Sequence, residues 1–596
     1  MKNVKQFYVI FIIILLSSFV ITNISFAQTH IPYGDVSGIW TIDGSPYIID
    51  GHISVPVDST LIVEPSVNIF FPEQNHFRVY GRLLAIGTES DTISFTASDT
   101  TDIFAGLYFC ETDTSFQDSS KLKHCRFDPG CVGFSNSSIA IVKNCIVTNG
   151  YGIGFNNSSP TIVDVTICNN TSQNYGGGIY CTDSSNPHLV NVTISGNSPD
   201  GICCSHNSNP TLEQVTIADN IGAGIGCIYS SSPILNNVTI SGNESGGIAC
   251  YNNSNPILDS VIISNNTVWS GLFCINSSPI LTDVIISGNS GYEGGGIYFE
   301  GIGSLLLQDV IITGNSALGM GGGVAIIGYG EEVVDIVMVD VVVADNYADD
   351  AGGIFCHVGV NLSLTNVTVS ENSVDDGGIV GGVGCEFDCI LNITNSIVWN
   401  NDPMDIYLYG FGCESNITYS DIGGQGWQGI GNINTDPLFA DPANGDFHLT
   451  WAHFPVQDST MSPCIDAGDP NSLLDPDSTI ADMGAYYFDQ TQNSVSNIPI
   501  QQSEFMLYQN YPNPFITVTK ISYNLPINIK NPTIEIFNIK GQIIKKLKIQ
   551  NSKFKINEVV WDGKDEHKNQ VSSGIYLYRI KTDDFVSKTK NMLLLR

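Results

Sequence analysis

The chain has 596 residues, 16 cysteines and a formal net charge of −36, which disfavours nucleic acid as a partner because the phosphates would be repelled. After the N-terminal segment no stretch holds about 18 uninterrupted apolar residues, so we expect no transmembrane helix in the mature chain.

Residues 1–27 have the pattern of a secretory signal peptide. Lys2 and Lys5 precede an apolar run at residues 7–20, and residues 25–27 supply a small-x-small cleavage site. A membrane anchor is the competing interpretation, but the apolar core is short and a cleavage site follows it. We therefore expect this segment to be removed and to take no part in the fold.

Residues 28–104 are expected to form an N-terminal cap and entry coils. Short apolar strands are predicted at residues 61–65 and 79–83. A repeat fold needs such a terminal unit to cover the open end of its core.

A 23-residue period dominates residues 105–435 and decides the predicted fold. Three markers share it: an apolar residue after Gly, a Ser/Asn-Pro turn, and a short apolar strand that ends in Asn. Each repeat is therefore predicted to be one coil of a solenoid. The apolar residues are Ile179, Ile202, Ile225, Ile248, Leu272, Ile297, Val324, Ile354 and Ile379; the prolines are Pro187, Pro210, Pro233, Pro256 and Pro279; the asparagines are Asn197, Asn220, Asn243, Asn266 and Asn289.

Within one repeat, apolar and small residues alternate as they do in short β-strands. Ile225 and Cys227 flank Gly226, and no helical spacing occurs in the unit. A leucine-rich repeat has a similar length, but its L-x-x-L-x-L-x-x-N pattern is absent. We predict an all-β, right-handed parallel β-helix of about 15 coils, stacked at roughly 4.8 Å.

These repeats resemble the parallel β-helix repeat proteins with a pectin-lyase-like fold. Their I-S-G-N-S…G-G-G-I-Y wording is also similar to the G-G-A-I and F-x-x-N repeats of bacterial polymorphic outer-membrane adhesins, over residues 150–400. Both resemblances imply the fold more than any activity.

Two columns of side chains are predicted inside the solenoid. Cysteines stand two residues after the repeat apolar residue, which places them inward, one per coil. Free buried thiols and disulfides between neighbouring coils both fit the strand spacing. The repeat asparagines are predicted to bond turn backbone in adjacent coils. The cysteines are Cys181, Cys204, Cys227, Cys250, Cys274 and Cys356.

Residues 436–490 are predicted to close the solenoid as a C-terminal cap. Their D-P-L-F, S-P-C-I-D-A-G and D-M-G-A-Y segments resemble the last coils of many secreted β-helix proteins. Asp475, Asp477 and Asp482 include a D-x-D spacing that suits the oxygen ligands of Ca²⁺, although the loop lacks the full EF-hand pattern. No cofactor is expected apart from Ca²⁺.

The charge balance changes abruptly after the cap. No Lys or Arg occurs between Lys143 and Lys520, whereas the segment from Lys520 onward is rich in Lys. This shift predicts a linker at residues 491–503 and a separate small Ig-like antiparallel β-sandwich at residues 504–596. Its alternating strands are expected at 520–523, 533–538 and 575–580.

Three motifs stand out in this unit: L-Y-Q-N-Y-P-N-P-F at residues 507–515, I-F-N-I-K-G at 536–541, and S-G-I-Y at 573–576. They resemble the opening, centre and close of type IX secretion sorting domains of type A, although the ending at 593–596 departs from that family. W-D-G-K-D is also similar to the Ig-like module of flagellar hook-capping proteins. The motif residues are Tyr511, Pro512, Asn513, Pro514, Phe515, Gly541, Gly574 and Tyr576.

This resemblance implies export by the type IX secretion machinery across the outer membrane of a Gram-negative, Bacteroidetes-like bacterium. The domain would then be removed and the rest attached to the cell surface or released. The expected location is therefore secreted or on the outer cell surface.

No catalytic residues are predicted. A lyase acting on uronates needs cationic groups, and residues 144–519 contain no Lys or Arg. The Gly-His-Gly and Arg-x-Lys motifs of polygalacturonase-like hydrolases are also missing. Paired carboxylates at 349–350 and 375–376 precede successive coils, and inverting hydrolysis, weak Ca²⁺ binding and plain turns all remain open for them.

Aromatic residues at outward positions of the repeat strand are candidates for stacking on sugar rings, and they can equally be ordinary exposed aromatics. The set is Tyr180, Tyr251, Phe273, Tyr298 and Phe355.

Taken together, the sequence predicts a secreted or surface-displayed β-helix protein with a non-catalytic adhesion, glycan-binding or structural role. Its expected partners are the type IX machinery and glycans or host and cell-surface molecules. The alternative is a secreted polysaccharide-active enzyme, resembling a glycoside hydrolase, on the β-helix face.

Overall fold

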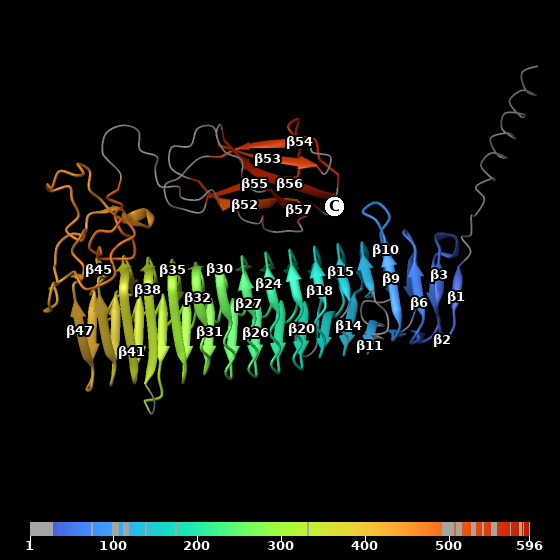
Figure 1. Ribbon diagram of the computed structural model, residues 1–596, viewed down its shortest axis with the longest axis horizontal. Helices are drawn as coiled ribbons and strands as arrows, with labels where there is room; N and C mark the ends of the chain where they lie inside the picture. Colours follow the sequence, from blue (N-terminus) through green and yellow to red (C-terminus); the bar gives the residue numbers. More distant parts are fainter. Residues whose placement is uncertain are drawn as a thin grey trace, which may run out of the picture.

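The computed structural model shows an all-β protein in which a parallel β-helix runs along the long axis, its coils following one another in chain order (Figure 1). Among the described residues, the helical pieces are the 3-10 turns η1 (Ile42–Gly44) and η2 (Pro442–Asn444). The structure describes residues 28–72, 75–97, 106–110, 119–136, 140–172, 176–330, 333–491, 506–507, 510, 515, 517–525, 532–538, 542–549, 557–572, 574–582, 587 and 589–594.

One strand of each coil joins a 16-stranded parallel sheet, which we call sheet B. Its strands are in register from coil to coil, so Ile202 lies opposite both Ile179 and Ile225. The strands are β2 (Gly34–Asp35), β5 (Ile53–Val55), β8 (Phe77–Val79), β11 (Leu107–Cys110), β14 (Cys131–Ser135), β17 (Gly152–Asn156), β20 (Ile179–Thr182), β23 (Ile202–Ser205), β26 (Ile225–Ile228), β29 (Ile248–Tyr251), β31 (Leu272–Ile275), β34 (Ile297–Glu300), β37 (Val324–Ile327), β40 (Ile354–His357), β43 (Val383–Glu386) and β46 (Ile406–Tyr409).

The rest of the wall is a 28-stranded sheet, which we call sheet A. Its strands are β1 (Thr29–Ile31), β3 (Gly38–Trp40), β4 (Tyr47–Ile49), β6 (Thr60–Val63), β7 (Asn68–Phe71), β9 (Arg82–Ile86), β10 (Ile93–Ala97), β12 (Lys121–Lys123), β13 (Cys125–Asp128), β15 (Ile141–Lys143), β16 (Ile146–Thr148), β18 (Thr161–Val163), β19 (Thr166–Cys168), β21 (His188–Val190), β22 (Thr193–Ser195), β24 (Thr211–Glu213), β25 (Thr216–Ala218), β27 (Ile234–Asn236), β28 (Thr239–Ser241), β30 (Ile257–Ser264), β32 (Ile280–Ser287), β35 (Ser304–Thr313), β38 (Val334–Ala344), β41 (Val360–Ser370), β44 (Ile390–Thr394), β45 (Ile397–Trp399), β47 (Glu414–Thr418) and β48 (Asp421–Ile422).

A left-handed residue bends the chain between the paired strands of sheet A. Asn191, Gln214 and Asn237 occupy this corner with φ of 52, 55 and 53°. Asn and Asp tolerate this conformation because their short polar side chains can bond locally, which explains the frequency of these residues at the corner. The corner thereby turns one run of chain into the two flat walls of each coil.

The loops of the later coils pair with one another and form a small four-stranded parallel sheet. Its strands are β33 (Ser290–Gly291), β36 (Ser316–Ala317), β39 (Tyr347–Ala348) and β42 (Ser373–Val374).

The core fills the inside of the coils as the alternation predicts. Ile225 and Cys227 are fully buried in the long core cluster, whereas Gly226 between them is not part of it. Burying one such aliphatic side chain stabilises the fold by about 1.5–3 kcal/mol, and the same contacts recur in every coil. The inward and outward positions of the repeat are therefore confirmed.

The predicted inward position of one repeat residue is wrong. Ile379 continues the series of apolar residues in the sequence, yet it is 38% exposed. Val383 instead lies opposite Ile354 in sheet B and is fully buried. The loop before this coil is longer than in the earlier coils, and the extra residues displace the repeat.

A ladder of buried asparagines runs along the solenoid and confirms the predicted role of these residues. The backbone N–H and Nδ2 of Asn243 donate to Oδ1 of Asn266 at 3.0 and 2.8 Å. The Asn243 Nδ2 also donates to the Ile217 carbonyl at 3.5 Å. We call this set the Asn ladder: Asn170, Asn197, Asn220, Asn243, Asn266, Asn289, Asn315, Asn346, Asn372 and Asn401.

A second ladder lies at the Ser/Asn-Pro turn. The backbone N–H of Ser208 donates to the hydroxyl of Ser231 at 3.1 Å, and Ser231 repeats this bond to Ser254 at 3.2 Å. The sequence marks this turn by its proline, but the buried side chain is the serine.

The cysteine column is inward as predicted, and its thiols are free. Cys204 lies opposite both Cys181 and Cys227, and all of these side chains are fully buried. Phe299 and Ile326 interrupt the column before Cys356. Burial raises the pKa of Cys181 well above its ordinary value, so the thiol stays protonated.

Residues after β48 pack against the outer face of sheet A at the last coils; they include the hairpin of β49 (Phe439–Asp441) and β50 (Asp446–Leu449), whose Phe447 meets Val342 and Ala344 of β38. Leu449, Trp451, Cys464 and Met483 pack with Ile397 of the last coils in one buried cluster. The Cys464 thiol also lies 3.3 Å from the carboxylate of Asp421 in β48.

The C-terminal segment forms two antiparallel sheets with a core of their own, and strands occur where the sequence predicts them. One sheet holds β51 (Met506–Leu507), β52 (Thr519–Asn524) and β55 (Asn557–Trp561). The other holds β53 (Thr533–Asn538), β54 (Ile543–Lys548), β56 (Gly574–Lys581) and β57 (Lys590–Leu594).

Over the part of the chain that the structure describes, no helix has the length and apolar character needed to cross a membrane. The predicted signal peptide (1–27) and most of the predicted linker (491–503) lie outside the described residues.

Candidate functional site

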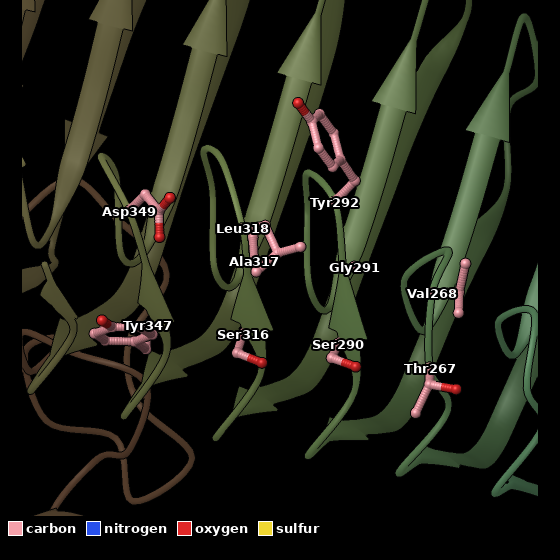
Figure 2. A pocket seen from close by; sticks show the side chains of 10 residues that line it. All are labelled: Thr267, Val268, Ser290, Gly291, Tyr292, Ser316, Ala317, Leu318, Tyr347 and Asp349. Carbon is pink, nitrogen blue, oxygen red and sulfur yellow. The ribbon is translucent and has the colours of Figure 1, made fainter.

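A surface hollow of about 500 Å³ lies along the loops that connect the Asn ladder to sheet B. The loop from Asn220 to Gly224 is short, whereas the loops after Asn266, Asn289 and Asn315 become longer from coil to coil. The longer loops form the small sheet of β33, β36, β39 and β42. Figure 2 shows the residues that line the hollow, which are Thr267, Val268, Ser290, Gly291, Tyr292, Ser316, Ala317, Leu318, Tyr347 and Asp349.

One row of the lining carries hydroxyl groups. Thr267, Ser290, Ser316 and Tyr347 each follow a residue of the Asn ladder, and they succeed one another along neighbouring loops (Figure 2). Parallel pairing of Ser290 with Ser316, and of Ser316 with Tyr347, fixes this row in register. We call these residues the hydroxyl row.

A second row is apolar and exposed. Val268, Tyr292 and Leu318 expose 56%, 68% and 69% of their surface, and each stands a residue or two beyond the hydroxyl row. Side-chain sticks in Figure 2 place Tyr292 and Leu318 on the same side of that row. Apolar side chains gathered at a hollow mark a binding surface more often than scattered ones do.

Carboxylates flank the hollow. Asp349 lines it, and the hydroxyl of Tyr347 donates a hydrogen bond to Asp375 on the next loop. Burial, together with the nearby charge of Glu300, raises the pKa of Glu293 above its ordinary value. Because residues 144–519 contain no Lys or Arg, neither of these side chains balances the acids within this segment.

The predicted sugar-stacking aromatics lie outside the main core, but three of the five are covered. Phe273, Tyr298 and Phe355 are only 7%, 9% and 6% exposed, so the expectation of open ring faces is wrong for them. Phe273 stacks on Tyr298 at 4.9 Å and receives the edge of Trp269 at 5.4 Å.

The physical reason is that neighbouring coils bring these rings together and the longer loops fold over them. Met320, Ala351 and Val380 cover Phe355 in the same way. Tyr180 and Tyr251 are half-buried.

The predicted Ca²⁺ residues hold turns together. Asp482 accepts backbone N–H groups of Asp466 and Phe488, both at 2.6 Å. Asp475 accepts the Asp482 N–H at 2.9 Å, and Asp477 likewise accepts backbone N–H groups. Burial raises the pKa of Asp482 to about 7 and that of Asp475 to about 6, which weakens both as cation ligands. This arrangement does not support a Ca²⁺ site.

The paired carboxylates at 349–350 and 375–376 also act in turns. The carboxylate of Asp350 accepts the N–H of Ile379 at 2.9 Å, and Asp375 accepts the Tyr347 hydroxyl. These contacts agree with the plain-turn interpretation. Of the four, only Asp349 lines the hollow.

Of the sorting-motif residues, Phe515 and Tyr576 have described side chains. Both rings pack against Trp561, with ring centroids at 5.5 and 5.1 Å. The backbone of Phe515 also forms an isolated parallel β-bridge with Leu594 of β57. Gly574 begins β56. The remaining residues, Tyr511, Pro512, Asn513, Pro514 and Gly541, lie outside the described residues.

The sequence missed the hollow, because none of its residues except Asp349 belongs to a motif. Two signals point to it in retrospect. A Ser or Thr follows the ladder residues Asn266, Asn289 and Asn315, and the spacing from Asn to the next repeat apolar residue increases in the same coils. Neither signal shows by itself that the loops lie side by side.

Across the described residues, no three His, Cys, Asp or Glu side chains converge as a metal site. Burial raises the pKa of the inward Cys181 thiol, which keeps it protonated. His188 Nε2 lies 3.1 Å from a carboxylate oxygen of Glu213, and His206 Nδ1 lies 2.5 Å from the Ser205 hydroxyl, so these two imidazoles lie on different coils.

Comparison with known families gives three matches, each covering less than half of the chain. "Right handed beta helix region" matches residues 177–337, "Periplasmic copper-binding protein (NosD)" matches 84–238, and "FlgD Ig-like domain" matches 517–584. No curated protein matches the chain. The donor set described above does not fit copper. The matches and the structure together identify a right-handed parallel β-helix, of a type found in periplasmic and extracellular proteins, joined to an Ig-like unit.

Proposed function

We propose that the chain is exported by type IX secretion through residues 504–596, and that the β-helix then acts outside the cell as a non-catalytic, glycan-binding adhesion protein. The main support is the packing of the C-terminal unit. Phe515 of the opening motif and Tyr576 of the closing motif meet at Trp561, so the motifs belong to one folded element.

Charge and packing also support a detachable unit. Among the described residues, the C-terminal core cluster contains none from the solenoid, and the Lys-rich composition of this unit contrasts with segment 144–519, which has no Lys or Arg. A unit with its own core can be removed without opening the solenoid.

The export proposal is tested in the native bacterium by truncating the chain after Ser503. We expect the truncated protein to accumulate in the periplasm and the full chain to reach the surface or medium, measured by immunoblotting of cell fractions. A Cys227→Ala chain with the sorting unit intact serves as control. Normal surface levels of the truncated chain would show that residues 504–596 do not direct export.

The non-catalytic proposal has a separate test. The full chain is incubated with neutral, anionic and cationic polysaccharides, and bound polymer and new reducing ends are measured together. We expect binding without release of reducing ends. Reproducible release, abolished by Asp349→Asn, would instead establish the alternative of a polysaccharide-active enzyme.

A further inference from the structure

We propose that the hollow between Thr267 and Asp349 binds an uncharged glycan chain laid across neighbouring coils. This inference rests on the proposed glycan-binding function and assigns it a site and a substrate class. The site is distinct from the sheet B aromatics, because it is built from the loops that follow the Asn ladder.

The two rows of the hollow match the two chemical faces of a sugar ring. The hydroxyl row offers donors and acceptors at a coil spacing of roughly 4.8 Å, which is a regular array for the hydroxyls of a linear polymer. Tyr292 and Leu318 offer exposed apolar surface beside it, suited to the C–H face of the ring. A chain running along the solenoid axis touches both rows at once.

Charge selects among glycans. Residues 144–519 contain no Lys or Arg, and Asp349, Asp375 and Glu293 lie at or near the hollow. Uronate and sulfated chains would be repelled by these carboxylates. Carboxylates accept hydrogen bonds from sugar hydroxyls, so neutral chains retain every favourable contact.

The site is built by rigid elements. Tyr347 lies in β39, its hydroxyl is held by Asp375, and backbone pairing fixes Ser290 and Ser316. The surrounding loops are anchored at one end by the fully buried Asn ladder. Little ordering is therefore needed when a ligand binds, which favours affinity.

The experiment measures binding of defined hexasaccharides to the full chain by isothermal titration calorimetry. The probes are cellohexaose (neutral), hexa-galacturonate (anionic) and chitosan hexamer (cationic). The variants are Tyr292→Ala combined with Leu318→Ser, and Tyr347→Phe. Tyr229→Ala is the matched control, because Tyr229 is 52% exposed on a different turn of the solenoid. Circular dichroism melting verifies that each variant is folded.

We expect cellohexaose to bind, hexa-galacturonate not to bind, and the double variant to lose roughly 10-fold in affinity while Tyr229→Ala does not. Tyr347→Phe should weaken binding less than the double variant does. Unchanged cellohexaose binding in the folded double variant would overturn this site while leaving glycan binding intact. Binding of hexa-galacturonate or chitosan hexamer without cellohexaose, or binding of no hexamer, would overturn the inference. Export of the chain is measured separately, by the cell fractionation described above.

Discussion

The solenoid with its cap and the C-terminal unit satisfy their buried polar groups in opposite ways. In the solenoid, neutral asparagines bond one another, and the buried carboxylates Asp421 and Asp482 lie in a segment without cations. In the C-terminal unit, Glu535 is 1% exposed and is met by Lys546 at 2.9 Å and Arg579 at 3.0 Å. The solenoid thus relies on a repeated hydrogen bond between neutral side chains, whereas the C-terminal unit relies on one buried carboxylate paired with cations.

This difference shows how the pKa of a buried carboxylate depends on whether Lys or Arg side chains pair with it. Burial raises the pKa of Asp421 to about 6, whereas at Glu535 the opposing hydrogen bonds from Lys546 and Arg579 outweigh burial and lower the pKa. The two regions should therefore respond differently to substitution, acid and salt.

The largest effect is expected in the Asn ladder. Asn243→Leu leaves the backbone N–H and Nδ2 of Asn220 and the carbonyl of Ile217 without their partner, all inside the solenoid. Each buried unpaired group costs about 1–3 kcal/mol, so we expect a loss of about 4 kcal/mol in the free energy of unfolding, measured with urea.

Asn236→Ala is the control, because Asn236 is on the same coil but bonds an exposed carboxylate. It should change stability by less than about 0.5 kcal/mol. Equal effects of the two substitutions would contradict the energetic role of the ladder.

The next effect separates the regions by pH. Asp421 in β48 and Asp482 in the cap have folded pKa values of about 6 and about 7, above the unfolded value near 3.8, so their charged forms destabilise the last coil and the cap. Lowering the pH from 8 to 5 should stabilise the last coil and the cap by about 4 kcal/mol, with most of the change between pH 7 and 5.

The pKa of Glu535 is lowered below its ordinary value of 4.5, so its contribution is present above that value and is lost below it. Hydrogen exchange resolved by peptide mass spectrometry measures both regions in one sample. A cap that exchanges faster at pH 5 than at pH 8, after correction for intrinsic rates, would refute the assignment.

A smaller effect is expected at the ionic centre. Glu535→Gln replaces charge-assisted hydrogen bonds by weaker ones and places amide hydrogens near Lys546 and Arg579, so the C-terminal unit should lose about 2 kcal/mol. Added salt should weaken the original unit more than the variant. Asp562→Asn, which breaks an exposed pair with Lys564, should have little effect. A salt response that is the same in both proteins would argue against an ionic contribution.

The smallest effect is expected in the cysteine column. Cys227→Ala removes a small buried group that is not crosslinked, and we expect a loss of about 1 kcal/mol. Native Cys204 and Cys250 should react slowly with a thiol reagent and rapidly in urea. Crosslinked peptides containing Cys227 in a non-reducing digest would show that the column is oxidised.

The repeating part of this fold was predictable because one pattern is written many times. The inward side of Ile225 and Cys227, and the ladder role of Asn243, follow from local alternation and a fixed period. The same reasoning failed at Ile379, because a longer loop shifts the period without leaving a mark on the strand. Covering of Phe273 and Tyr298 also depends on neighbouring loops, so it could not be read from the strand that carries them.

The hollow could not be predicted from the sequence, for a related reason. Its residues are ordinary Ser, Tyr and Leu, and they become a site only because parallel loops lie beside one another. The carboxylate of Asp482 had a recognisable pattern, but its partners are backbone groups of Asp466 and Phe488, which no side-chain motif reveals.

The Asn ladder has a consequence for how such a molecule changes in length. Asn220 and Asn243 make equivalent bonds to the preceding coil and to the next ladder residue. Removing residues 221–243 would join Asn220 to Asn266 through the same pair of donors and the same acceptor, and duplicating them would do the reverse. The protein can thus be lengthened or shortened by whole units during evolution, and the distance between its two ends becomes an inherited quantity that one recombination event can alter.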